Sequence, residues 1–178
     1  MLASGMGRRG GLLFWFIIYE MVSWLVAAVS GFITLRFGHA RPVESIGFIF
    51  SRDPLNAVVC TWLSNTSSFF LGAVLVIINP FLGLLSVAYL SLSLGDLLAS
   101  WLAGYCPTPH LIYGVVETQA YVLLWLLAVR TYLSQRLCGG LTCRWLSTVS
   151  QVKRLLPLAT ASFLVLAAVE VAEVLTYG

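Results

Sequence analysis

Long apolar runs separated by short polar segments dominate the pattern of the chain. About 20 apolar residues cross the hydrocarbon core of a bilayer as a helix. The chain shows no strict alternation of apolar and polar positions and no regularly spaced turn residues, which argues against a β-barrel. We therefore predict an all-α, polytopic transmembrane helical bundle in a single domain over residues 1–178, with about five spans at residues 11–35, 55–78, 81–103, 110–133 and 155–177.

The connections between these runs differ in length. Pro80 in "INPF" leaves room only for a tight hairpin between the second and third runs, and "GYCPTP" at residues 104–109 is a second short connection. Residues 36–54 and 134–154 form longer, charged linkers. In these regions we expect "IGFIF" (46–50) and "LTCRWLSTVSQVKRLL" (141–156) to form short segments on the membrane surface.

The composition of the chain supports membrane insertion. Of its 178 residues, 60% are hydrophobic and only 10% are charged, which lies well outside the usual range for a soluble domain. The spans use up most of the length, so no room remains for a soluble catalytic domain. The net charge of +3 comes from basic residues that lie mostly outside the apolar runs. We therefore expect contact with membrane lipid and do not expect binding to nucleic acid.

The distribution of lysine and arginine predicts the orientation. Seven basic residues fall on the side of the N-terminus and three on the other side, and an excess of basic residues marks the cytoplasmic side. We predict an N-in, C-out protein of the cell (plasma) membrane with an uncleaved first span. The seven are Arg8, Arg9, Arg130, Arg136, Arg144, Lys153 and Arg154, and the three are Arg36, Arg41 and Arg52.

Four scattered cysteines give little sign of metal or disulfide chemistry. Cys138 and Cys143 flank "GGLT" in a basic linker and can form a local disulfide or half of a metal site. No second pair or nearby histidine completes a ligand set, so free thiols are the favoured interpretation. We predict no metal site and no cofactor.

Acidic residues inside the apolar runs are the main functional signal. Five of the seven acids lie there, and no lysine or arginine lies deep enough in a run to pair with them. At a helical rise of about 1.5 Å per residue, Asp96 and Glu117 both lie roughly 12 Å from the same membrane surface and can face each other. We predict an intramembrane polar centre, with Glu173 nearer the interface, made of Glu20, Asn65, Asp96, Glu117 and Glu170.

Two roles for this polar centre remain open. A charged carboxylate in hydrocarbon is costly, so such groups face the bundle interior, are protonated or line a wet cavity. In the first role the acids join helices by hydrogen bonds, to hydroxyl neighbours such as Ser64, Thr66, Ser67, Ser91 and Ser93. In the second role nearby carboxyls share a proton or hold a cation.

Other patterns have simpler interpretations. Ser23, Ala27 and Gly31 form a stripe of small residues that permits close helix packing, with a homodimer as the alternative. His39 and His110 are predicted to lie at different depths from any serine or cysteine that they would activate. We therefore predict that the chain is not an enzyme and has no catalytic residues.

Two stretches of the chain have a characteristic order: "NTSSFFLGAVLVIINPFLGLLSVAYLSLSLG" at residues 65–95, then a Pro-His element that leads to "GVVETQA" at residues 114–120. This order of features resembles the stage II sporulation protein M family. The family motif is close to Pro-His-Gly-x-x-Glu-x-x-Ala. Here His110 stands four residues before Gly114, and Tyr113 occupies the place next to the glycine. The residues that correspond to the family pattern are Gly114, Glu117, Ala120, His110, Asn65 and Gly95.

This resemblance implies a polytopic membrane protein that organises partner proteins. The leading hypothesis is a non-enzymatic scaffold or assembly subunit whose polar centre fixes helix packing or the docking of a protein partner. The alternative is a transport component: a permease-like subunit that works with an ATPase, or a proton or cation pathway through the intramembrane acids.

Overall fold

The computed structural model describes residues 3–38, 40, 53–136 and 138–177. In these residues the chain forms five helices: α1 (Ala3–Arg36), α3 (Pro54–Ile78), α4 (Pro80–Leu102), α5 (Thr108–Gln135) and α6 (Leu141–Tyr177). All five are long and apolar enough to cross a membrane. The predicted all-α bundle of five spans is therefore confirmed.

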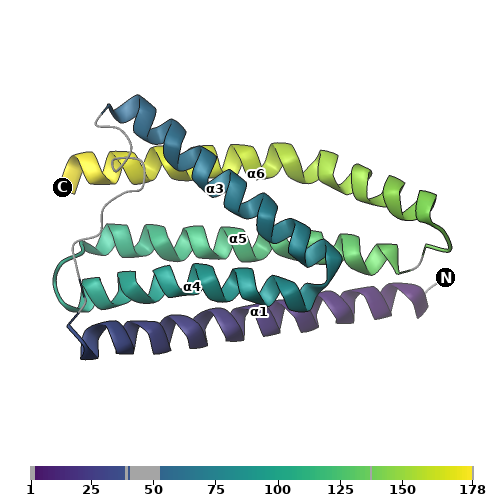
Figure 1. The fold of residues 1–178 in the computed structure, drawn as a ribbon, viewed down its shortest axis with the longest axis horizontal. Coiled ribbons are helices and arrows are strands. Elements are labelled where there is room, and N and C mark those ends of the chain that lie inside the picture. Colours follow the sequence, from purple (N-terminus) through teal and green to yellow (C-terminus); the bar gives the residue numbers. More distant parts are fainter. Residues whose placement is uncertain (1–2, 39, 41–52, 137, 178) are drawn as a thin grey trace.

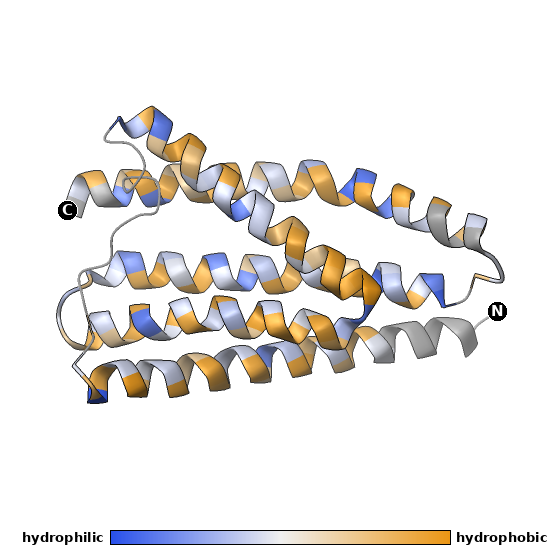
Figure 2. Cartoon of the chain, in the orientation of Figure 1, coloured by the Kyte–Doolittle hydropathy of each residue, from blue (hydrophilic) through white to orange (hydrophobic). Residues whose placement is uncertain are grey.

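The five helices form a bundle around α5. Figure 1 shows α6, α5, α4 and α1 side by side, with α3 crossing them diagonally and with the two termini at opposite ends. The central helix α5 contacts α1, α3, α4 and α6, and it is the most buried of the five spans. In Figure 2 apolar positions follow the length of every helix, as lipid-facing helices require.

Helix boundaries follow from local capping chemistry. The Asp53 side chain accepts a hydrogen bond from the Asn56 amide at 3.1 Å, and Pro54 occupies the first position of α3. Asn79, the single residue between α3 and α4, accepts from the Phe81 amide at 3.0 Å through its side chain. This cap forms the tight hairpin that the Asn-Pro sequence predicts. After α4, Gly104 turns the chain with a φ of 80°, a conformation that suits glycine.

The beginning of α6 differs from the prediction. Residues 141–156 do not form a separate surface helix but continue into the last span as one helix that contains Pro157. Proline inside a helix removes one backbone hydrogen bond and its ring crowds the preceding turn, so contacts with other helices must help to hold this segment in place. Hydrogen bonds join Ser147 to Ser134 at 3.0 Å and Thr148 to Gln135, so this part of α6 is held against the end of α5. The predicted "IGFIF" surface segment and His39 lie outside the described residues.

The small-residue stripe of α1 packs against α4 in the same chain. The Ser91 hydroxyl donates to Ser23 Oγ at 2.9 Å, deep in this contact. A Cβ atom added to Gly95 would lie 2.5 Å from the Ala27 carbonyl oxygen, and one added to Gly31 would lie 2.9 Å from the Gly95 carbonyl oxygen. Small residues on both helices therefore allow the two backbones to approach closely.

Aromatic side chains fill the centre of the bundle. Tyr19, Phe69, Trp125 and Phe163 are almost completely buried in one cluster. The Trp125 indole donates to the Phe69 carbonyl at 3.1 Å, and it occupies the space that a side chain at residue 72 would need, so glycine is required there. The indole thereby packs α5 directly against α3.

We expect Gly95→Ala to destabilise the bundle by about 1–3 kcal/mol, the typical cost of overpacking. The added methyl group would meet the Ala27 carbonyl oxygen and the Ser30 side chain of α1, and a backbone carbonyl cannot move aside as a flexible side chain can. The measurement is the free energy of unfolding in mixed micelles. Gly10→Ala is the control, because a Cβ atom there meets nothing within 4 Å. Equal stability of the two variants would contradict the described α1–α4 contact.

Candidate functional site

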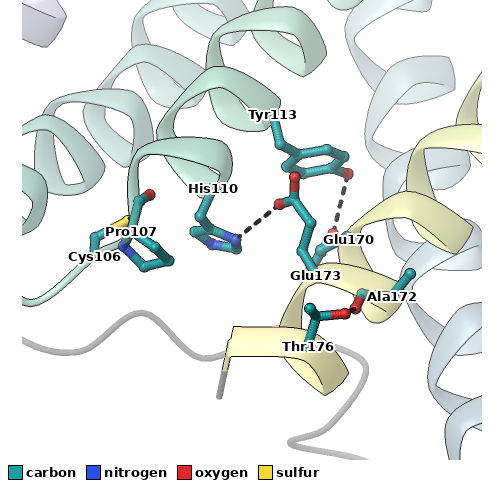
Figure 3. A network of polar contacts seen from close by, with 8 residues as sticks. All are labelled: Cys106, Pro107, His110, Tyr113, Glu170, Ala172, Glu173 and Thr176. Atoms are coloured by element: carbon teal, nitrogen blue, oxygen red, sulfur yellow. Dashed lines mark hydrogen bonds and ion pairs between the residues drawn. The ribbon is translucent and has the colours of Figure 1, made fainter.

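Acidic side chains of α5 and α6 contact polar groups on neighbouring helices. Glu117 of α5 accepts a hydrogen bond from the Asn65 amide of α3, with 2.5 Å between Oε1 and Nδ2. Glu170 of α6 accepts from the Tyr113 hydroxyl of α5 at 3.1 Å. One turn further along α6, Figure 3 shows Glu173 directed at His110, with 3.4 Å between Oε2 and Nδ1. These contacts tie α5 to both α3 and α6.

Two further acids take part in contacts between α1 and its neighbouring helices. Glu20 accepts from the Gln119 amide of α5 at 3.2 Å and from the Trp24 indole at 3.1 Å, both through Oε2. Asp96 of α4 accepts from the Thr34 hydroxyl of α1 at 2.6 Å. Among the described residues, no lysine or arginine pairs with any of the five acids in the spans. Each of these acids instead meets a neutral donor or a histidine on a different helix.

The predicted polar centre is thus brought together only in part. Asn65, Glu117 and Glu170 line one cavity. Asp96 lines an adjoining cavity together with Glu117 and Glu170. Glu20 lines neither cavity. Asp96 and Glu117 share a cavity, but the hydrogen bond of Asp96 goes to Thr34 of α1 and not to Glu117.

Two of the hydroxyl groups predicted to bond to the acids, those of Ser67 and Ser91, donate to other acceptors. Ser91 donates to the Val87 carbonyl and to Ser23, and Ser67 donates to the Ser64 carbonyl. Hydroxyl groups in helices readily bond to a carbonyl three or four residues earlier in the same helix. The donors that reach the acids are the amides of Asn65 and Gln119, the phenol of Tyr113, the indole of Trp24 and the hydroxyl of Thr34.

Two adjoining cavities lie beside these residues. The larger, about 580 Å³, is formed by α3, α4 and α5 with a contribution from α6, and we call it the α3–α4 cavity. The smaller, about 290 Å³, extends between α4, α5 and α6 toward His110 and Asp96. Both are lined by Leu90, Ser93, Glu117 and Glu170. The two carboxyl groups therefore stand where the cavities join.

The residues of the family-like motif have distinct surroundings. Gly114 lies against Leu97 so closely that a Cβ atom would overlap the leucine side chain, which explains a glycine at this α4–α5 contact. His110 stands in the first turn of α5 and pairs with Glu173. Ala120 is half-buried on the same helix. The motif thus marks the face and the start of α5 that pack against α4 and α6.

Several residues of the site were missed by sequence reasoning. Tyr113 stands four residues before Glu117 on α5, a spacing that places both on one helix face. Gln119 and Thr34 carry donors, but nothing in their spacing identifies the helix that they face. Thr61 stands four residues before Asn65 on α3 and lines the same cavity. The spacing of polar residues by four was the one usable signal.

The structure corrects the interpretation of the cysteines. Cys138 and Cys143 form a disulfide across the α5–α6 loop, with 5.6 Å between their Cα atoms, although free thiols were the favoured prediction. Cys60 and Cys106 are free. The residues that the structure describes contain no group of three or more potential metal-ligating side chains.

Comparisons of the chain with models of known protein families, with curated proteins and with solved structures found no match. The geometry of the polar residues and of the cavities therefore carries the functional argument. Three features bear on it: acids bonded between helices, two carboxyls at a cavity junction, and an apolar outer surface on every span.

We expect Cys106 to react slowly with a maleimide. The thiol is only 6% exposed, and burial, with a smaller effect of the Glu173 charge, raises its pKa. A raised pKa leaves less thiolate at a given pH, so labelling should be slow near neutral pH and accelerate as the pH rises toward that raised value. The measurement is the labelling rate between pH 7 and 9 in a Cys60→Ala background.

The control for this prediction is Tyr105→Cys in a Cys60→Ala, Cys106→Ala background, because Tyr105 is exposed in the same loop. We expect the control cysteine to label faster at every pH tested. Equal rates and equal pH profiles for the two positions would contradict the described burial of Cys106.

Proposed function

We propose that the chain is a non-enzymatic scaffold or assembly subunit that organises protein partners at the cell membrane. The observation that carries the proposal is the bonding of the membrane acids. All five contact a polar group on another helix, which is what acids used for helix packing require. A bundle fixed in this way offers a rigid surface to partners.

The resemblance to the stage II sporulation protein M family supports the same proposal. The residues that carry it include Asn65, Gly95, Gly114 and Glu117, and each lies at a contact between helices. Members of that family organise partner proteins, and a motif that fixes helix packing suits such a role. A second copy of this chain is one partner that the proposal allows.

A transport component is the second candidate function, and the cavities favour it. Glu117 and Glu170 line both cavities, and no lysine or arginine is among the lining residues. Carboxyl groups at a wet junction inside a membrane are typical of proton or cation pathways. In this alternative the chain forms such a pathway or works as a permease-like subunit with an ATPase.

For the orientation we propose N-in and C-out. The excess of lysine and arginine on the side of the N-terminus supports it. The Cys138–Cys143 disulfide stands at this same end and is the observation that opposes it, because cytosolic thiols are usually kept reduced. The proposal therefore predicts that this pair is reduced in cells, and an oxidised pair in cells would contradict it.

The scaffold proposal predicts that Glu117→Gln and Asp96→Asn are mild changes. An amide carbonyl still accepts a hydrogen bond from Asn65 or Thr34, so recovery of partners should change by less than about threefold, equivalent to about 0.6 kcal/mol. The measurement is purification of the tagged chain from its native membrane in mild detergent, with quantitative mass spectrometry of co-purifying proteins. Glu117→Ala, which leaves Asn65 without its acceptor, should lose partners more strongly.

The transport alternative predicts a different result for the same variants. Glu117→Gln would abolish a proton- or cation-dependent flux in liposomes that hold the purified chain and any ATPase recovered with it. Loss of function in a Glu117→Gln protein of unchanged stability would contradict the scaffold proposal. Recovery of envelope proteins, with no flux at any pH, would contradict transport.

A further inference from the structure

The α3–α4 cavity contains a buried hydroxyl group without a partner. Thr61 is 1% exposed and lines the cavity, yet its Oγ1 atom has no hydrogen-bond partner among the described residues. A buried polar group that lacks a hydrogen bond costs about 1–3 kcal/mol. A threonine in a helix ordinarily avoids this cost by bonding to its own backbone. The free hydroxyl therefore points to a ligand that supplies the missing bond.

The cavity has a buried base and an open rim. At the base, Tyr121, Trp125 and Glu170 are at most 8% exposed. At the rim, Leu71 of α3 and Tyr89 of α4 are 68% and 74% exposed. Both helices cross the membrane, and these rim residues stand well inside their spans. The cavity therefore opens sideways, toward the bilayer and not toward either aqueous surface.

The lining defines the chemistry of a ligand. Two carboxyl groups, Glu117 and Glu170, meet no lysine or arginine in the lining. Trp125 and Tyr121 present aromatic rings that attract cations. Toward the rim, leucines provide an apolar surface for a hydrocarbon tail. The volume of about 580 Å³ suits a small molecule.

We propose that the α3–α4 cavity binds an amphiphile with a protonated amine headgroup and an apolar tail, which enters from the bilayer. The ammonium group donates to the carboxyl groups of Glu117 and Glu170 and to the free hydroxyl of Thr61, which matches its three N–H donors. The tail follows the leucines to the rim. A bound cation would also offset the cost of holding carboxylates in hydrocarbon. This site goes beyond the scaffold role and does not depend on it.

Binding of radiolabelled decylamine to the full chain in phosphatidylcholine nanodiscs tests the proposal. We expect saturable binding of about one molecule per chain above the level in empty nanodiscs. Unlabelled decylamine should displace the label, whereas 1-decanol and decanoic acid at the same concentrations should not. Binding that does not saturate, or equal displacement by decanol, would overturn the proposal because it would show simple partitioning.

Matched variants locate the site. Glu117→Gln should weaken binding by about tenfold or more, since it removes a charge-assisted hydrogen bond, and Thr61→Val should weaken it several-fold. Glu20→Gln is the control, because this half-buried acid of α1 lies outside the cavity and should leave binding unchanged. Wild-type affinity in both cavity variants would overturn the proposed site.

A second type of variant keeps the test decisive if Glu117→Gln fails to fold. Ser86 lines the cavity on α4 and is only half-buried, so Ser86→Phe should fill the cavity without removing any bond to the acids. We expect this variant to unfold like the wild type and to lose decylamine binding. A folded Ser86→Phe protein that binds decylamine normally would overturn the proposal. Partner recovery from native membranes is a separate readout, so failure here leaves the scaffold role to its own test.

Discussion

The bilayer interior offers no water to polar groups, and the arrangement of this bundle depends on that constraint. Every acid placed in a span needs a partner from the chain itself. Glu117 meets Asn65, Glu170 meets Tyr113, and each of the remaining acids also meets a polar group on a neighbouring helix. In water such bonds would add little, because solvent competes for both partners. In hydrocarbon the alternative to each bond is an unsatisfied carboxyl group, so the bonds select one arrangement of the helices.

The central helix α5 takes part in most of these bonds, and the cavities result from its position. Its side chains reach α3 through Glu117, α6 through Tyr113 and α1 through Gln119. The hairpin at Asn79 joins α3 to α4 at one end only, and α3 then crosses the bundle at an angle to α4 (Figure 1). Space opens between the two helices as they diverge, and polar residues of α5 form its base. The same bonds that hold α3 in place thus keep a polar cavity open beside it.

Apolar length and the unpaired acids could be read from the sequence, but the pairing of helices could not. The five runs and the Asn-Pro hairpin correspond closely to the helices because spans need a minimum length and proline fixes a helix start. Counting residues along helices also placed Asp96 and Glu117 at one depth. The count fixes no rotation about the helix axis, so it did not show that Asp96 bonds to Thr34 of α1 while Glu117 bonds to Asn65. The Cys138–Cys143 bond was missed because it depends on how a glycine-containing loop folds back.

The central claim is that hydrogen bonds of intramembrane acids hold the helices together, and a double-mutant cycle on Asn65 and Glu117 tests it most directly. The free energy of unfolding in mixed micelles would be measured for Asn65→Ala, Glu117→Ala and the double variant. We predict a coupling energy of about 0.6 kcal/mol or more, up to about 1.7 kcal/mol, which are the average and the upper value for hydrogen bonds between membrane helices. A parallel cycle on Asn65 and Glu20, which do not bond to each other, should be additive within about 0.5 kcal/mol. A coupling energy of zero between Asn65 and Glu117 would contradict the account.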